Sequence, residues 1–284
     1  MTSITLKYAA EILPVLLKSK IVPYFRGSPA IGKSSVAHQV AAQLGLKVID
    51  IRLAECDPTG IQGFPYFDQE TKKASYYPLN TFPTENDSIP DGYNGWLVFL
   101  DEFSNAPLAV QGAAYRLVLD RQVGQHKLHK NVAIIAAGNR EDDNAAAQPM
   151  SSALVSRFSI FEIEVNQKEW NEWAAEAGID YLITSYMNFR PDHLYTFKPS
   201  TSEQPYASPR TWAMLSNVMQ HISLTANELP ILASLIGEGV ASEFLGYLKL
   251  QDELPSFETI SLCVQKHFSN CVSTRALYSG KRTT

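Results

Sequence analysis

The chain has 284 residues, of which 45% are hydrophobic and 19% charged, and its formal net charge is −5. Such a composition is typical of a globular protein of one large or two modest domains. The net negative charge argues against general nucleic-acid binding. Cys56, Cys263 and Cys271 form no C-x-x-C pair, which disfavours a disulfide scaffold or structural zinc. With neither a secretion signal nor a membrane-spanning stretch in the sequence, we expect a cytoplasmic protein without membrane contact.

Strand and helix patterns alternate along the first 166 residues. A helix is expected over 5–18, and further helices over 34–44 and 107–120. The expected strands are 21–26, 47–53, 96–100, 132–138 and 158–165. The runs at 96–100 and 132–137 are continuously apolar, which is typical of central parallel strands covered on both faces. The alternation predicts an α/β fold with a parallel five-stranded sheet flanked by helices.

Beyond residue 166 the pattern becomes helical. The expected helices are 167–178, 179–188, 209–221, 226–237, 238–250 and 256–269, and a Pro/Ser/Thr-rich loop spans 190–209. We therefore expect an αβ domain over 1–166 and a small all-helical domain over 167–284, with frayed residues at 276–284.

A phosphate-binding loop follows the first expected strand. The segment from Gly27 to Ser34 fits the pattern G-x-x-x-x-G-K-[ST] at every fixed position. Its backbone N–H groups can surround a polyphosphate, while Lys33 contacts the β- and γ-phosphates and the Ser34 hydroxyl binds Mg²⁺. The expected binding residues are Gly27, Ser28, Pro29, Ala30, Ile31, Gly32, Lys33, Ser34 and Ser35.

A second motif supplies two acids. The apolar run 96–100 is followed by Asp101 and Glu102. At the tip of a strand, Asp101 can hold Mg²⁺ together with Ser34, and Glu102 can take a proton from the attacking water as general base. The alternative reading is a strand that ends in solvated acids.

The combination of motifs resembles the AAA+ ATPases, and most closely the MoxR and dynein-related group, over residues 1 to about 220. The resemblance implies an AAA+ P-loop NTPase fold in which the helical domain forms a lid over ATP and Mg²⁺. It also implies a homo-oligomeric ring, with a hexamer as the expected size. Remodelling of a protein client is the implied activity, and a von Willebrand A domain protein is the implied partner.

The same resemblance assigns three further catalytic residues. Asn139 matches the first sensor, which orients the lytic water. Arg157, in the segment 152–158, matches the arginine finger that reaches the γ-phosphate of a neighbouring subunit. Arg210, in Ser-Pro-Arg-Thr at 208–211, matches the second sensor on the lid. With Glu102, these residues form the expected catalytic set.

Some residues depart from the usual family pattern or lack a clear role. The loop reads Pro-Ala-Ile-Gly-Lys-Ser, where Pro-Gly-x-Gly-Lys-Thr is more usual. Arg140 has three alternatives: an ion pair with Glu141, one with Asp142, or a contact across a subunit boundary. Basic residues that are weaker candidates for contacts between subunits are Arg116 and Arg121.

Two hairpins are expected, over 63–77 and 121–130. They either touch substrate near the pore of a ring or pack on their own domain. His126 and His129 are interpreted as solvated turn residues rather than metal ligands. The remaining conspicuous residues are expected to pack in the interior: Trp170, Trp173, Cys263 and Cys271.

Three functions are compatible with these motifs. The favoured hypothesis is a MoxR-type motor or chaperone. The alternative is a nucleic-acid motor or loader with the same nucleotide site, in which lysines at 72–73 and 127–130 face the pore. A nucleotide-gated switch with little turnover is disfavoured because Glu102, Asn139 and Arg157 are all present.

Overall fold

The computed structural model describes residues 3–70, 72–143, 149–199, 204–222 and 226–253. The helix expected at 256–269, with Cys263 and Cys271, lies outside the described residues, as do the residues at 276–284.

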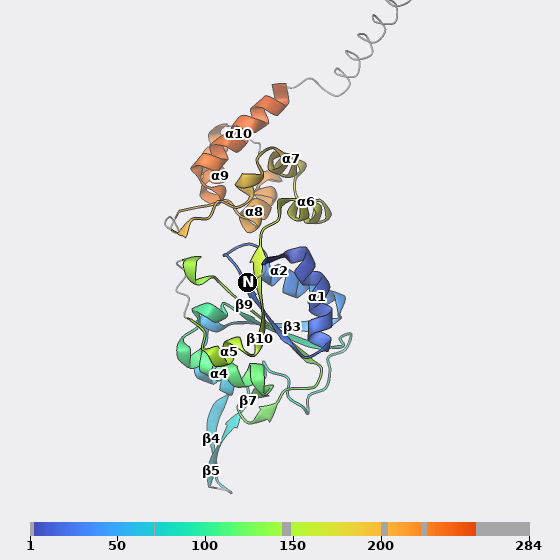
Figure 1. Cartoon of the computed structure of the whole chain (residues 1–284), viewed down its shortest axis with the longest axis vertical. Coiled ribbons are helices and arrows are strands. Elements are labelled where there is room, and N and C mark those ends of the chain that lie inside the picture. Colours follow the sequence, from blue (N-terminus) through green and yellow to red (C-terminus); the bar gives the residue numbers. More distant parts are fainter. Residues whose placement is uncertain (1–2, 71, 144–148, 200–203, 223–225, 254–284) are drawn as a thin grey trace, which may run out of the picture.

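The first half of the chain is built on a six-stranded parallel sheet, in the order β1-β10-β2-β9-β6-β3 (Figure 1). Its strands are β1 (Ser3–Thr5), β2 (Val22–Arg26), β3 (Leu46–Arg52), β6 (Gly95–Asp101), β9 (Val132–Gly138) and β10 (Phe158–Glu164). The expected parallel α/β sheet is confirmed, but the expected number of five strands was wrong. The additional strand, β1, pairs with β10 at the sheet edge, and three residues are too few to show a strand periodicity.

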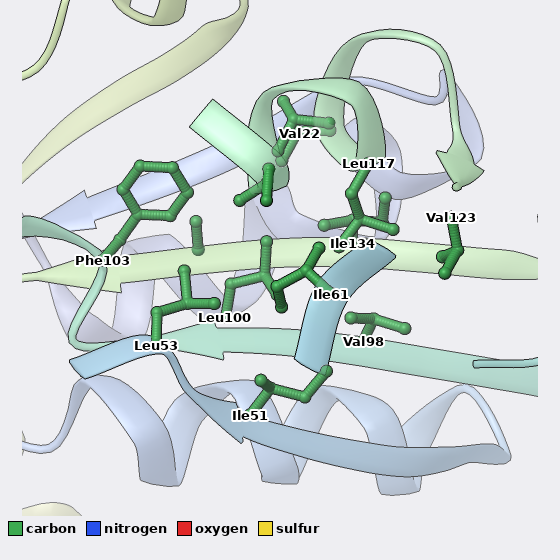
Figure 2. Packing of buried hydrophobic residues seen from close by; sticks show 14 of the residues in the cluster. Val22, Ile51, Leu53, Ile61, Val98, Leu100, Phe103, Leu117, Val123 and Ile134 are labelled. Carbon is green, nitrogen blue, oxygen red and sulfur yellow. The ribbon is translucent and has the colours of Figure 1, made fainter. Parts of the chain in front are cut away.

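Helices cover both faces of this sheet because neighbouring side chains on a strand point in opposite directions. In β6, Leu97 and Phe99 pack toward α1 (Leu6–Lys18) and α2 (Lys33–Gln43). The other face carries Val98 and Leu100, which pack with Ile61 and Leu117 in Figure 2. The helices over that second face are α3 (Pro58–Gln62), α4 (Leu108–Leu119) and the short α5 (Ser152–Val155).

Both expected hairpins are present. The longer one pairs β4 (Phe64–Asp68) with β5 (Lys73–Tyr77) and extends from the end of the molecule opposite the later helices (Figure 1). The shorter one pairs β7 (Gln122–Val123) with β8 (His126–Lys127).

The two histidines near the shorter hairpin differ. His126 is half-buried, and its Nε2 lies 3.0 Å from the Tyr76 carbonyl oxygen. The expectation of a solvated His129 was wrong: its ring is buried, packs edge-on against Trp96, and accepts the Asn131 N–H at Nδ1. Within the described residues, no group of three or more His, Cys, Asp or Glu side chains is arranged to hold a metal ion.

The residues after β10 are helical and share a separate hydrophobic cluster around Tyr186, Trp212 and Phe244. The elements are α6 (Gln167–Glu176), α7 (Tyr181–Phe189), α8 (Pro209–Met219), α9 (Leu229–Ile236) and α10 (Glu238–Glu253), with single 3-10 turns at Pro191–Leu194 and Ala226–Glu228. Trp170 is buried in this cluster, whereas Trp173 stays 40% exposed. No described helix has both the length and the apolar character needed to cross a membrane.

Candidate functional site

The predicted site residues lie at the carboxyl edge of the sheet. Gly27 follows β2, Asp101 ends β6, and Asn139 follows β9. Because β9 lies between β2 and β6, their tips are neighbours. Open parallel sheets bind ligands at this edge.

The loop between β2 and α2 contains two residues in the left-handed region, Ala30 with φ 62° and Gly32 with φ 106°. Gly32 is the N-cap of α2, so the free N–H groups of the first helical turn follow the loop directly. A Cβ at Gly27 would lie 2.8 Å from Ile31 Cδ1 and 3.0 Å from the Ile163 carbonyl oxygen, so a side chain there would require these neighbours to shift. The backbone is thus shaped for an anion at the start of α2.

Lys33 lies inside this loop and is only 8% exposed. Its Nζ donates hydrogen bonds to the carbonyl oxygens of Gly27 (2.6 Å) and Ser28 (2.9 Å), and it lies 3.3 Å from Asn139 Oδ1. Burial lowers the pKa of this ammonium to about 8, although the nearby Asp101 carboxylate acts in the opposite direction. The structure therefore brings Lys33 and Asn139 into contact.

Ser34 and Asp101 are also in contact. The Ser34 hydroxyl donates to Asp101 Oδ2 over 2.9 Å, while Asp101 Oδ1 accepts the Glu102 N–H over 2.8 Å. Mg²⁺ prefers oxygen ligands and usually takes only one or two from the protein, the rest coming from phosphates and water. A paired hydroxyl and carboxylate beside a phosphate loop fits this requirement.

Glu102 has an unusual backbone conformation. It lies between β6 and the 3-10 turn Phe103–Asn105, with φ 54° and ψ 34°. A non-glycine residue in this region is strained, and such residues concentrate at functional sites. The sharp turn therefore comes directly after Asp101, the last residue of β6.

The Asn139 backbone is fixed by the turn after Glu102. Its N–H donates to Ser104 Oγ over 2.8 Å. The preceding Gly138 is closely surrounded, since a Cβ there would lie 2.1 Å from the Tyr24 hydroxyl oxygen and 2.8 Å from Ser104 Oγ. Burial raises the pKa of Tyr24 to about 12, so this phenol stays protonated at neutral pH.

Arg140 does not pair as the sequence suggested. Instead of binding Glu141 or Asp142, its guanidinium pairs with Glu162 of β10 and donates to the Ile163 carbonyl oxygen. Glu162 also accepts from Arg26 over 2.8 Å. The sequence could not show this arrangement, because the β10–β2 pairing that places Glu162 beside Arg26 joins residues 136 positions apart.

A cleft of about 580 Å³ lies between the phosphate loop and helices α6 and α8. Arg210, in the first turn of α8, is exposed and lines this cleft together with Ser34. Apolar side chains that also line it are Leu6, Ala10, Ile31, Val165, Trp170 and Met214. The cleft therefore extends from Ser34 of the phosphate loop past apolar side chains to Arg210.

Arg157 lies elsewhere. It follows α5, is exposed, and does not line the cleft. Its Nη1 lies 3.3 Å from Ser156 Oγ, and in the described part of the chain it makes no ion pair. Of the weaker candidates, Arg116 is exposed on α4, whereas Arg121 is partly buried and donates to the Val132 carbonyl oxygen.

Two residues near the loop were missed by the sequence analysis. Asp143 is buried and accepts from the Ser28 hydroxyl over 3.2 Å. Tyr195, from the long loop before α8, donates its hydroxyl to the Pro29 carbonyl oxygen over 3.1 Å. Neither has a sequence signal, since one lies in a run of three acids and the other in an irregular loop.

The chain was compared with curated proteins and with solved structures. No curated protein matches the chain. Among solved structures, a candidate ATPase of Cytophaga hutchinsonii is 16% identical over 80% of this chain and 62% of its own, with a TM-score of 0.44. The RuvB Holliday junction branch migration motor of Thermotoga maritima is 16% identical over 86% of this chain and 68% of its own, with a TM-score of 0.43. NtrX of Brucella abortus is 15% identical over 80% of this chain and 54% of its own, with a TM-score of 0.43.

A family model decides the assignment. It matches residues 23–166, which is half of the chain and contains the phosphate loop, Asp101, Glu102, Asn139 and Arg157. The sheet order and the helical region after it are consistent with the same fold. The chain therefore belongs to the ATPase family associated with various cellular activities (AAA).

Proposed function

We propose that this protein is a Mg²⁺-dependent ATPase that assembles into a ring and remodels a protein client in the manner of the MoxR group. The observation that carries the ATPase proposal is the convergence of Lys33, Ser34, Asp101 and Asn139 at one point of the sheet edge. Three separate segments of the chain supply these side chains, and each type has a role in triphosphate hydrolysis.

In the proposed mechanism, the loop N–H groups and Lys33 hold the β- and γ-phosphates. Ser34 and Asp101 would hold Mg²⁺, which would neutralise charge on the phosphate oxygens. Glu102 accepts a proton from the attacking water, and Asn139 orients that water by a hydrogen bond. The contact between Lys33 and Asn139 supports this assignment, because it places the Asn139 amide beside the phosphate-binding ammonium.

Two arginines complete the proposed site. Arg210 lines the cleft from α8. It can therefore reach the γ-phosphate when the helical region closes over the bound nucleotide. Arg157 is exposed and outside the cleft, which supports a role in the site of a neighbouring subunit. A ring, with six subunits as the proposed number, follows from a finger that acts only between subunits.

The longer hairpin is the proposed contact with the client. Its aromatic side chains are unusually exposed, with Phe64 at 57%, Phe67 at 64% and Tyr77 at 60%. Exposed aromatic side chains on a chain of net charge −5 suit a protein client better than a polyanion. By its resemblance to the MoxR group, we propose that a von Willebrand A domain protein takes part.

Nucleotide binding and turnover of matched variants test the proposal. Glu102→Gln should lower kcat by at least about a hundred-fold while ATP still binds, whereas Lys33→Ala should lose binding. The control is Glu85→Gln, the same exchange at an exposed loop position. Unchanged turnover in Glu102→Gln would reject Glu102 as the base.

Two further measurements separate the ring and client proposals. The ATPase rate per subunit should fall on dilution, because the site is completed between subunits, and a rate that stays flat contradicts the ring. Single-stranded DNA at low salt should leave the rate unchanged. Stimulation that disappears with added salt would instead favour the nucleic-acid motor.

A further inference from the structure

The phosphate loop receives a hydrogen bond from a segment far away in the sequence. The Tyr195 hydroxyl donates to the Pro29 carbonyl oxygen over 3.1 Å, and the two residues are 166 positions apart. Pro29 belongs to the loop after β2, whereas Tyr195 follows the 3-10 turn Pro191–Leu194 of the helical region. This bond therefore joins the backbone of the nucleotide loop to the part of the chain that covers it.

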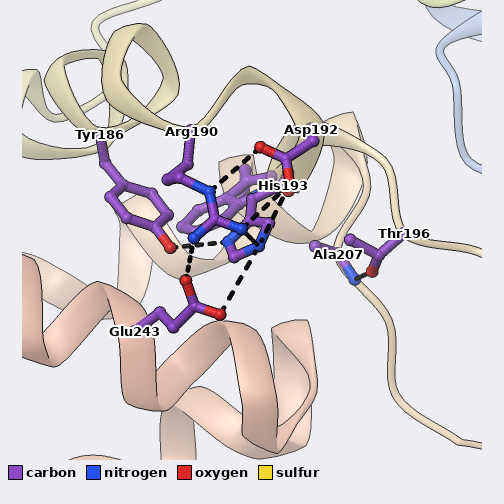
Figure 3. A network of polar contacts seen from close by, with 8 residues as sticks. Tyr186, Arg190, Asp192, His193, Thr196, Ala207 and Glu243 are labelled. Carbon is purple, nitrogen blue, oxygen red and sulfur yellow. Dashed lines mark hydrogen bonds and ion pairs between the residues drawn. The ribbon is translucent and has the colours of Figure 1, made fainter.

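Contacts within the helical region fix the position of Tyr195. Its ring packs on those of Phe197 and Tyr206, with centroid distances of 6.2 and 6.3 Å. The adjacent backbone is closed by two hydrogen bonds between Thr196 and Ala207, of 2.9 and 3.0 Å, the second of which is drawn in Figure 3. Burial raises the pKa of Tyr195, so the hydroxyl remains a donor throughout the neutral range.

The residue after Pro29 has a strained backbone conformation. Ala30 has φ 62°, a conformation that glycine adopts freely but that brings the Cβ of alanine too close to the backbone. The other left-handed residue of the loop is Gly32, which carries no such cost. An interaction that holds the neighbouring peptide can therefore favour the conformation at Ala30.

Tyr195 is placed to supply that interaction. The Pro29–Ala30 peptide bond is trans, so its C=O and N–H point in opposite directions. When Tyr195 holds the carbonyl oxygen on one side, the Ala30 N–H must point to the other side of the loop.

We propose that Tyr195 is a positioning residue for nucleotide binding, which holds the Pro29–Ala30 peptide in the orientation that aims the Ala30 N–H at the phosphates. The proposal rests on the proposed function of the loop as an ATP site. It explains how this chain uses alanine at a left-handed position. It also links the helical region to the phosphate loop by a contact separate from Arg210.

Affinity for a non-hydrolysable ATP analogue, measured by calorimetry, tests the proposal in a double-mutant cycle. Tyr195→Phe should weaken binding about five-fold, the factor of a typical net hydrogen bond. In an Ala30→Gly background, where the left-handed conformation has no steric cost, the same exchange should weaken binding less than about two-fold. Tyr206→Phe removes a hydroxyl from the same aromatic cluster and should leave the affinity unchanged.

A loss that is equally large in the Ala30→Gly background would overturn the proposal, because Tyr195 would then act only by stabilising the helical region. Equal affinities of Tyr195→Phe and the wild type would also overturn it. A wild type that binds no analogue would refute the ATP site itself. For that case, amide hydrogen exchange over residues 27–33 in nucleotide-free protein gives a separate readout. Faster exchange in Tyr195→Phe than in Tyr206→Phe supports the proposed orientation of the Pro29–Ala30 peptide by Tyr195. Equal exchange in the two variants refutes it.

Discussion

Two clusters of polar side chains, one in each half of the molecule, satisfy their charged groups in different ways. At the sheet edge, the Lys33 ammonium is bound mainly to backbone carbonyl groups, and its pKa is lowered to about 8 by burial. In the helical region, Arg190 pairs with Asp192 and Glu243 and lies 2.8 Å from His193 Nε2 (Figure 3). The first cluster buries a charge whose carboxylate partners act only at a distance, whereas the second satisfies its charges by direct pairing.

The difference indicates different roles. A buried charge with a perturbed pKa is typical of a functional site, and its cost is recovered when a ligand of opposite charge binds. A network in which each ionic group has a partner fixes a conformation instead. The Trp212 indole N–H, which donates to the His193 carbonyl oxygen over 2.9 Å, ties that network to α8 and to the Arg210 that it carries.

The largest expected effect concerns the exposed Arg157. Arg157→Ala should lower kcat about a thousand-fold or more with little change in nucleotide affinity, because an arginine finger stabilises the transition state. Mixing Arg157→Ala with Lys33→Ala subunits should restore part of the activity, since one keeps an intact loop and the other an intact finger. Lys18→Ala, at another exposed basic position, is the control. No recovery in the mixture would contradict action between subunits.

The pH dependence of nucleotide binding tests the role of the Lys33 charge. The affinity should be constant below about pH 8 and fall up to about ten-fold per pH unit above it, because only the ammonium binds phosphate well. Calorimetry in two buffers at pH 9 should detect proton uptake on binding. An affinity that stays constant between pH 7 and 9.5 would show that the Lys33 charge does not matter.

In the nucleotide-free protein, the free energy of unfolding should rise with pH, whereas the nucleotide affinity should fall with pH. Since the pKa of Lys33 is lowered in the fold, burying the ammonium destabilises the folded chain below about pH 8, and this contribution disappears as the pH rises toward 10.5. Lys33→Arg, whose guanidinium stays charged, should remove both pH dependences.

The network of the helical region should respond through stability. The Tyr186 hydroxyl lies 2.7 Å from His193 Nδ1, and both side chains are buried. Tyr186→Phe leaves that nitrogen without a partner and should lower the free energy of unfolding by about 1–3 kcal/mol in urea denaturation. Tyr181→Phe on the same helix, where the side chain is 71% exposed, is the matched control. Loss of turnover without loss of stability would contradict a structural role.

The smallest effect is expected in the longer hairpin. Phe67 is 64% exposed and lies opposite Ala74 across the two strands. Phe67→Ser should change the free energy of unfolding by less than about 0.5 kcal/mol, as for other exposed positions. A loss above about 1 kcal/mol would show that this side chain packs on its own domain and is not reserved for a client.

The sequence predicted the elements of the sheet that carry long local patterns. Continuous apolar runs identified β6 and β9, and the fixed spacing of the phosphate loop placed Lys33 and Ser34 at the start of α2. The convergence of the phosphate loop with Asp101 and Asn139 was also foreseeable, because segments that follow adjacent parallel strands meet at the same edge of the sheet.

Contacts made by irregular segments could not be predicted. Tyr195 and Asp143 reach the phosphate loop only because the chain folds back over 166 and 115 residues, and no periodicity records such a return. Arg140 pairs with Glu162 rather than with its acidic neighbours in sequence, and Glu162 comes from β10, a strand that follows later in the chain. The division of the chain near residue 166 and the catalytic roles of Glu102, Asn139, Arg157 and Arg210 remain predictions.

The close packing around Gly138 limits how this protein can vary. The space that a methyl group at Gly138 would need is filled by the Tyr24 phenol from the neighbouring strand β2 and by Ser104 Oγ. Tyr24 lies on the strand that leads into the phosphate loop, and Gly138 immediately precedes Asn139. Homologues that retain a large aromatic residue at position 24 must therefore retain glycine at position 138. The strand β2, which leads into the phosphate loop, and the end of β9, which leads into Asn139, are thus expected to evolve as a pair.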